Sequence, residues 1–160
     1  MTVYVPDASA LAEVERLVPI DEHPPVFFAL AEMIQSEELA LCEQLCTELE
    51  RVSNKGQAHL FVKQGKGQSL NRGADYNRVR VVMARHQFID PMDHREYCAP
   101  YVLAQALELR DEGHRVVVIT EDRFRKVPPL VSMAQAAESE QLATLGTAAF
   151  LGNKGIWSER

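Results

Sequence analysis

The stretch Arg115-Val116-Val117-Val118-Ile119-Thr120 decides the fold, because four consecutive apolar β-branched residues, Val116 to Ile119, run here without alternating with polar ones. Such a run is typical of a strand that is covered on both faces, as strands in parallel sheets are. Gly113 ends a helical pattern just before the run, and Asp122 follows soon after it. We therefore expect a buried parallel strand that ends beside an acidic residue.

A second strand is expected over residues 2–6, which are mostly β-branched or aromatic and lead directly into Asp7. Ser9 is expected to cap the next helix. Residues 65–75 are glycine-rich and polar, and residues 78–83 fit either a strand or a helical turn. Helical patterns cover residues 9–17, 24–34, 42–52, 94–110, 130–138 and 147–151. Alternating strands and helices predict an α/β three-layer sandwich with a central, mainly parallel sheet in a single domain.

Composition narrows the class of protein. A chain of 160 residues fits one domain. No apolar run approaches the roughly 20 residues that span a bilayer, and the N-terminus lacks a signal-peptide pattern. We therefore expect no membrane partner. Three cysteines cannot all pair, so we also expect a reducing, cytoplasmic location.

Charge is unevenly distributed along the chain. Seven basic residues and one acid lie between Ser53 and Phe88, so this window carries +6 and the remainder −12. Such segregation favours binding of a polyanion at one place. A solvated basic loop without a partner is the alternative.

Three acids are candidates for a metal site. Asp7 and Asp122 each follow a predicted strand, and ligands of parallel sheets bind beyond the carboxyl ends of the strands. Glu48 shares a helical face with apolar residues, where an unpaired carboxylate is costly. Converging carboxylates need a cation, and hard oxygens suit Mg²⁺ or Mn²⁺. Taken singly, Asp7 also fits a turn residue, Glu48 the margin of an apolar stripe, and Asp122 a helix cap.

Together, these segments resemble the PIN-domain family. The run Val5-Pro6-Asp7-Ala8-Ser9 is similar to the first PIN motif, and Glu48 within residues 45–49 to the second. Residues 100–109 resemble the helix of the third motif, and Thr120-Glu121-Asp122 the fourth. The resemblance covers residues 4 to about 151, so we delimit a PIN-like domain at residues 1–152, with a basic, partly irregular segment at 53–90 and a tail at 153–160.

The resemblance implies a metal-dependent ribonuclease, often the toxin of a toxin–antitoxin pair like virulence-associated protein C. The catalytic and metal-binding residues would be Asp7, Glu48 and Asp122, holding Mg²⁺ or Mn²⁺ for attack of water on an RNA phosphodiester. Ser9 and Thr120 would orient the acids or the water. The RNA backbone would be bound by basic residues of the middle segment, namely Lys63, Lys66, Arg78 and Arg80. An antitoxin protein or a second copy of the chain would be a further partner.

One expected acid is missing. In the third motif the family has Asp immediately before the Pro-Tyr-Val stretch, and this chain has Ala99. Glu96, one helical turn earlier, is an auxiliary candidate. Asp90 and Asp93 are candidates only if their segment folds back. A catalytically impaired PIN-fold protein that binds RNA or a protein partner is therefore the alternative function.

Other patterns in the sequence give weaker functional predictions. Cys42 and Cys46, with His94 and Cys98, have the spacing of a tetrahedral zinc site if the two helix starts meet. Residues 63–67 resemble a phosphate loop but lack its strand–loop–helix frame. A flavodoxin-like small-molecule domain lacks any phosphate loop after its first strand.

Overall fold

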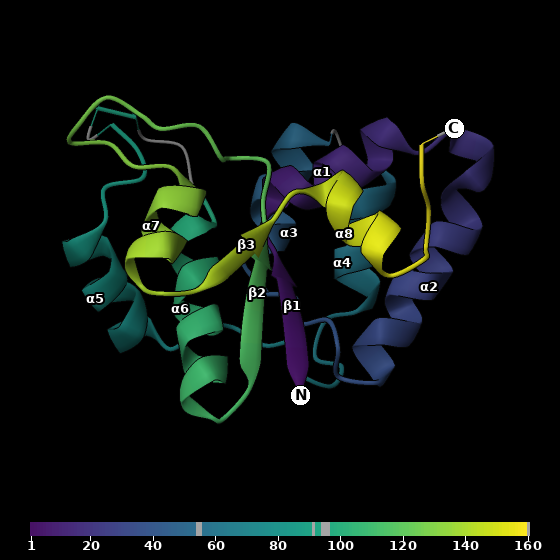
Figure 1. Ribbon diagram of the computed structural model, residues 1–160, viewed down its shortest axis with the longest axis horizontal. Helices are drawn as coiled ribbons and strands as arrows, with labels where there is room; N and C mark the ends of the chain where they lie inside the picture. The colour runs from purple at the N-terminus through teal and green to yellow at the C-terminus, as the bar shows by residue number, and fades with distance from the viewer. Residues whose placement is uncertain (54–55, 91, 94–96, 160) are drawn as a thin grey trace.

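A parallel sheet lies at the centre of the computed structural model, which describes residues 1–53, 56–90, 92–93 and 97–159 (Figure 1). Its strands are β1 (Thr2–Pro6), β2 (Arg115–Ile119) and β3 (Ala143–Leu145), hydrogen-bonded in that order. Val3 pairs with Val116 and Val5 with Val118, so the two apolar runs found in the sequence lie side by side. The predicted α/β class with a parallel sheet in one domain is confirmed.

Helices make up most of the rest of the described chain. In order they are α1 (Ala8–Leu17), α2 (His23–Gln35), α3 (Leu45–Val52), α4 (Gln57–Gln64), α5 (Tyr76–Arg85), α6 (Ala99–Asp111), α7 (Met133–Ser139) and α8 (Thr147–Asn153). A 3₁₀ turn, η1 (Ile20–Glu22), precedes α2. None of the described helices combines the length and apolar character needed to cross a membrane.

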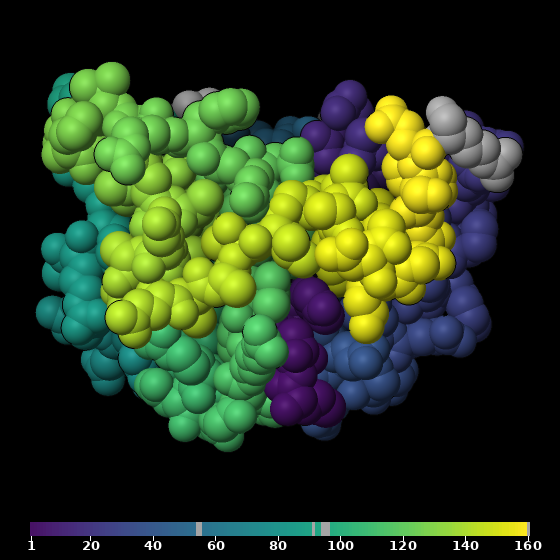
Figure 2. Space-filling model, viewed as in Figure 1, coloured from purple at the N-terminus to yellow at the C-terminus, as the bar shows by residue number. Residues whose placement is uncertain are grey.

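The helices form two layers around the sheet. Helices α5, α6 and α7 lie on one side, and α1, α2, α4 and α8 on the other (Figure 1). Helix α6 is buried along most of its length, including Val102, Leu103 and Leu107. On the other side, the rings of Tyr4 and Phe150 lie 5.0 Å apart, which packs α8 against β1. In the space-filling view the segment from β3 through α8 crosses the front of the molecule (Figure 2).

A short extended segment lies along the free edge of β1. The backbone nitrogen of Tyr4 donates to the Glu38 oxygen at 2.8 Å, and the nitrogen of Ala40 donates to the Tyr4 oxygen at 3.0 Å. These parallel contacts satisfy backbone groups that the edge would otherwise leave unpaired. The first strand is thereby flanked on both sides, which positions Asp7 at its carboxyl end.

Several predicted element boundaries differ from the structure. Asp7, not Ser9, caps α1, and the helix expected from Cys42 begins at Leu45. The undecided segment at 78–83 belongs to α5, whose N-terminus is capped by Asp75 through the Asn77 nitrogen. Helix α6 begins at Ala99, and residues 94–96 lie outside the described residues. Helix α4 and strand β3 were not predicted.

Candidate functional site

Asp7 lies at the carboxyl end of β1 and is only 5% exposed. Its Oδ1 accepts hydrogen bonds from the Ser9 hydroxyl at 2.6 Å and from the Ala10 nitrogen at 2.9 Å. Its Oδ2 accepts a hydrogen bond from the Thr120 hydroxyl, at the end of β2, at 2.5 Å. The structure thus brings together three of the residues that the sequence singled out.

The two hydroxyls that contact Asp7 have a common role. Ser9 Oγ accepts the Glu121 N–H at 3.0 Å, and Thr120 Oγ1 accepts the Asp122 N–H at 3.0 Å. Because each hydroxyl accepts from the backbone just past β2, its own hydrogen is available for the carboxylate. The arrangement fixes the orientation of Asp7 and joins the ends of the two strands.

Burial of Asp7 has an electrostatic consequence. Loss of water around the carboxyl group raises its pKa from 3.8 to about 6, while the hydrogen bonds from Ser9, Thr120 and Ala10 act in the opposite direction. The nearby charge of Glu48 raises this pKa further. Asp7 and Glu48 therefore interact through space, and their negative charges together would attract a cation.

Glu48 projects from α3 toward the start of α6. Its Oε1 accepts a hydrogen bond from the Cys98 backbone nitrogen at 2.8 Å, which places a carboxylate at a helix N-terminus. Burial raises the pKa of the Cys98 thiol well above its usual range, and the charges of Glu48 and Asp7 act in the same direction. Cys98 therefore lies near both acids, a relationship that spacing in the sequence did not predict.

Asp122 has different contacts. Its Oδ2 accepts a hydrogen bond from the Met133 nitrogen at 2.9 Å, at the first residue of α7, and lies 3.6 Å from the Lys126 amine. This carboxylate satisfies one of the free N–H groups that every helix start exposes. Asp122 thus supplements the cap of α7, whose N-cap residue is Ser132, while its backbone remains joined to Asp7 through Thr120.

The remaining acidic candidates are arranged as follows. Asp90 Oδ1 accepts from the Met92 nitrogen at 2.8 Å, and Asp93 Oδ2 accepts from the Tyr97 hydroxyl at 2.7 Å. Glu96 lies outside the described residues. Across the described part of the chain, no three or more His, Cys, Asp or Glu side chains form a group able to hold a metal ion. Ala99 is the first residue of α6 and is partly buried.

One acid near the site was missed by the sequence reasoning. Glu121 Oε2 accepts a hydrogen bond from the Thr147 nitrogen at 2.8 Å, at the start of α8. The consecutive acids Glu121 and Asp122 thus accept hydrogen bonds from the first residues of α8 and α7, respectively. The signal available in the sequence was only its position between Thr120 and Asp122, which does not reveal where the side chain points.

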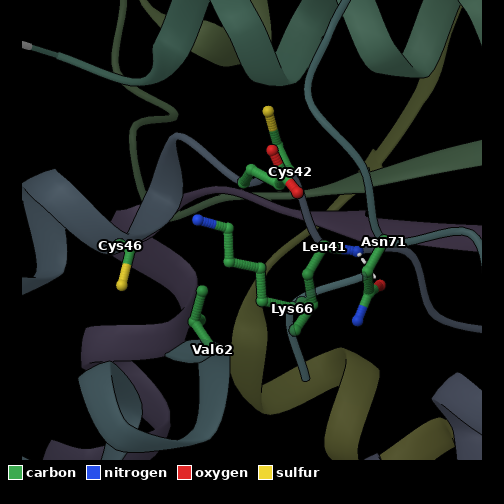
Figure 3. Close-up of a pocket in the computed structure, with 7 residues that line it drawn as sticks. Leu41, Cys42, Cys46, Val62, Lys66 and Asn71 are labelled. Atoms are coloured by element: carbon green, nitrogen blue, oxygen red, sulfur yellow. Dashed lines mark hydrogen bonds between the residues drawn. The ribbon is translucent and has the colours of Figure 1, made fainter. Parts of the chain in front are cut away.

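The four basic residues assigned to RNA do not lie on one surface. Lys63 is exposed on α4, whereas Arg78 and Arg80 lie on α5, on the opposite side of the sheet (Figure 1). Arg78 forms an ion pair with Asp111. Lys66 lines a small pocket between α4 and the start of α3 (Figure 3). The continuous basic window of the sequence is therefore divided in space.

The same pocket places two of the cysteines considered for zinc. In Figure 3 the sulfur atoms of Cys42 and Cys46 point in different directions. The Cys42 thiol donates to Gln44 Oε1 at 2.8 Å, and burial raises its pKa to about 11. A neutral, hydrogen-bonded thiol is a poor metal ligand. His94, the fourth member of that set, lies outside the described residues.

A cavity of about 310 Å³ adjoins Glu48. Thr47 from α3 and Tyr97, Cys98 and Tyr101 around the start of α6 contribute to its walls. An aromatic-lined cavity of this size beside a carboxylate accommodates a small planar group. Glu48 is thus accessible from a hollow, whereas Asp7 is buried beside it in the fold's interior.

The carboxylate oxygens of Asp7 and Glu48 are of the chemical kind that suits a hard divalent cation. Asp7 and Glu48 supply two carboxylates, and Mg²⁺ in proteins is commonly held by one or two carboxylates together with water and phosphate oxygens. Within the described structure, Asp7 Oδ2 accepts only from Thr120, which leaves it a second lone pair. The residues present are therefore compatible with one Mg²⁺ or Mn²⁺ ion.

Comparisons with protein-family models, with curated proteins and with solved structures found no match to this chain. The strongest indication of a functional site is the buried carboxyl group of Asp7 at the carboxyl end of β1, whose pKa is raised by burial and further by the charge of Glu48 on α3.

Proposed function

We propose that the chain is a PIN-type, Mg²⁺- or Mn²⁺-dependent ribonuclease that cleaves RNA phosphodiesters. The observation that carries the proposal is the buried carboxyl group of Asp7, whose pKa of about 6 reflects burial and the nearby charge of Glu48. Strongly perturbed acids in such positions are candidates for functional sites. The cation would supply charge neutralisation at the phosphodiester and a more acidic water.

The residues would divide the work as follows. Asp7 and Glu48 would bind the cation, while Ser9 and Thr120 hold Asp7 in one orientation by donating to its two oxygens. Asp122 would be the third ligand through Oδ1, because Oδ2 is engaged by Met133 and Lys126. The toxin role, an antitoxin partner, a homodimer and a cytoplasmic location are proposed on the family resemblance alone.

The competing function is a catalytically impaired PIN-fold protein that binds RNA or a protein. Two observations favour it: α6 begins with Ala99, which has no carboxylate, and Asp122 accepts a hydrogen bond from the first backbone nitrogen of α7. A site with two carboxylates retains less charge for a cation than one with four. Metal binding and cleavage must therefore be measured separately.

The test is calorimetric titration with Mn²⁺ at pH 5 and pH 8, followed by incubation of labelled single-stranded RNA with Mn²⁺ or with EDTA. Because a cation competes with the proton on Asp7, affinity should rise between these pH values. Asp7→Asn and Glu48→Gln should abolish binding and cleavage. The matched control is Glu32→Gln, at an exposed acid on α2.

Two results would count against the ribonuclease. If wild type binds no Mn²⁺ at pH 8, the acids are structural and the non-catalytic alternative is favoured. If wild type binds Mn²⁺ and RNA but leaves the RNA intact, the site is a PIN-like metal site without catalysis. The control Glu32→Gln should then give the same result as wild type.

A further inference from the structure

The segment that connects β2 to α7, residues 121–131, presents an exposed aromatic ring. Phe124 is 85% exposed, and Val127 in the same segment is 82% exposed. Scattered apolar side chains are common on protein surfaces, so exposure alone indicates little. Phe124, however, lies in the run Arg123-Phe124-Arg125-Lys126, where three cations surround the ring.

In this segment, which we call the 121–131 loop, the acidic side chains contact helices, whereas the basic side chain of Arg125 is exposed. Its acids Glu121 and Asp122 are turned toward the N-termini of α8 and α7. Arg125 is exposed and makes no hydrogen bond or ion pair within the described structure. Positive charge is therefore available on the outside of the loop, next to the exposed ring.

The remaining two cations are only weakly engaged. Arg123 donates to the Thr144 hydroxyl at 3.3 Å, a neutral partner, and is exposed. Lys126 lies 3.6 Å from Asp122 Oδ2, a separation typical of a loose ion pair. Both side chains can therefore exchange these contacts for a phosphate at small cost.

Backbone hydrogen bonds to neighbouring segments hold the loop in place. The Lys126 nitrogen donates to Gln135 Oε1 at 3.1 Å, and the Val131 nitrogen donates to the Gln87 oxygen at 2.9 Å. A platform that is already ordered loses less conformational entropy on binding than a free segment. In Figures 1 and 2 this loop forms the upper left corner of the molecule, above α7.

The loop also begins at the candidate site. It follows directly after Thr120, the residue that donates to Asp7, and so leaves the carboxyl end of β2 where the acids lie. Exposed aromatic rings flanked by cations suit single-stranded nucleic acid, since bases stack on the ring while phosphates pair with the cations. A purely apolar protein partner would gain nothing from the three charges.

We propose that the 121–131 loop binds single-stranded RNA, with one base stacked on Phe124 and the adjoining phosphates held by Arg125 and its basic neighbours. This inference rests on the proposed function, because it names how that site would receive its RNA. It assigns RNA binding to a segment outside the basic window of the sequence.

The experiment measures binding of a short labelled single-stranded RNA by fluorescence anisotropy, in EDTA so that no cleavage occurs. Phe124→Ala should weaken binding by roughly 5- to 150-fold, the range expected for loss of one base–aromatic stack. Phe124→Trp should retain affinity. Phe28→Ala, at another exposed ring, on α2, is the control and should match wild type.

A second ligand separates stacking from charge. For a strand of the same length that lacks bases, Phe124→Ala and wild type should bind equally. Arg125→Gln should weaken binding of both strands and reduce the slope of log affinity against log salt by about one. Equal binding of the RNA by Phe124→Ala and wild type would overturn the proposal, as would absence of RNA binding by wild type.

The protein-interface alternative has its own outcome. If Phe124→Ala leaves RNA affinity unchanged but alters the oligomeric state measured by light scattering, the loop is an interface between proteins and the proposal is wrong. Failure of the ribonuclease proposal looks different: RNA would stay intact in Mn²⁺ although the effect of Phe124→Ala on binding persists. Conversely, cleavage with no effect of Phe124→Ala on binding would reject the loop alone.

Discussion

Glu48 Oε1 accepts a hydrogen bond from the Cys98 backbone nitrogen at 2.8 Å, so a carboxylate from α3 lies at the start of α6. The next residue, Ala99, is where the resemblance to PIN domains leads us to expect an acid. Glu48 thus already places one negative charge at the N-terminus of α6, and an acid at position 99 would add a second. This relationship makes the missing acid testable by adding it back.

Ala99→Asp should make stability depend more strongly on Mn²⁺. Without cation, the new carboxylate repels Glu48 and Asp7, offset in part by a few tenths to about 1 kcal/mol from the helix N-terminus. With Mn²⁺, a tenfold gain in affinity adds about 1.4 kcal/mol to the free energy of unfolding. Chemical denaturation with and without Mn²⁺ measures both effects. Ala99→Asn is the control, and an equal response of the two variants would contradict the prediction.

Asp7→Asn should remove a pH dependence of stability. The pKa of Asp7 is raised from 3.8 to about 6 on folding, so the native state favours the protonated form. That contribution is fully present below pH 3.8 and is lost as the pH rises through about 6, a difference on the order of 3 kcal/mol. Wild type should therefore lose stability relative to Asp7→Asn between pH 4 and neutral pH, measured by urea denaturation in EDTA. Parallel curves for the two proteins would show that Asp7 is not the group responsible.

Strands β1 and β2 and the position of Asp7 were predicted because each strand is a short run of mainly apolar residues that is followed closely by an acid. Strand β3 was not, because its three residues acquire strand geometry only by pairing with β2, as Ala143 does with Val117. Helix α4 was not predicted because it is short and its N-cap residue, Gly56, provides no side-chain hydrogen bond. Elements that depend on tertiary contacts leave little trace in local sequence.

The site was predictable to a similar extent. Thr120 and Ser9 follow strand ends near Asp7, so their hydrogen bonds to it agree with position alone. The direction of Asp122 was not predictable, because its partner Met133 starts a helix that local sequence does not place in space. Likewise, the basic window is continuous in sequence but is divided between α4 and α5 in the fold.

Thr120→Val should destabilise the protein more than Thr147→Val, although both threonines are fully buried. Thr120 Oγ1 donates to Asp7 Oδ2 and accepts from the Asp122 nitrogen, whereas the Thr147 hydroxyl makes a single 3.4 Å contact with the Ala10 oxygen. Unsatisfied buried groups cost about 1–3 kcal/mol each. Loss of the Thr120 hydrogen bond should also raise the pKa of Asp7 further, because that bond lowers it. Denaturation across pH measures both changes, and similar losses in the two variants would count against this network.

Asp122→Asn should separate the capping role of Asp122 from its proposed role as a ligand. The amide keeps an oxygen that can accept from the Met133 nitrogen, so the free energy of unfolding should stay close to that of wild type. Asp122→Ala removes the acceptor of the N–H of buried Met133 and should cost about 1–3 kcal/mol, the range for a buried donor left unsatisfied. If Oδ1 binds the cation, Asp122→Asn should nevertheless weaken Mn²⁺ binding in calorimetry. Glu121→Gln is the matched control, since Glu121 accepts from the Thr147 nitrogen at the start of α8 in the same manner. Unchanged Mn²⁺ affinity in Asp122→Asn would restrict Asp122 to capping α7 and leave Asp7 and Glu48 as the metal-binding acids.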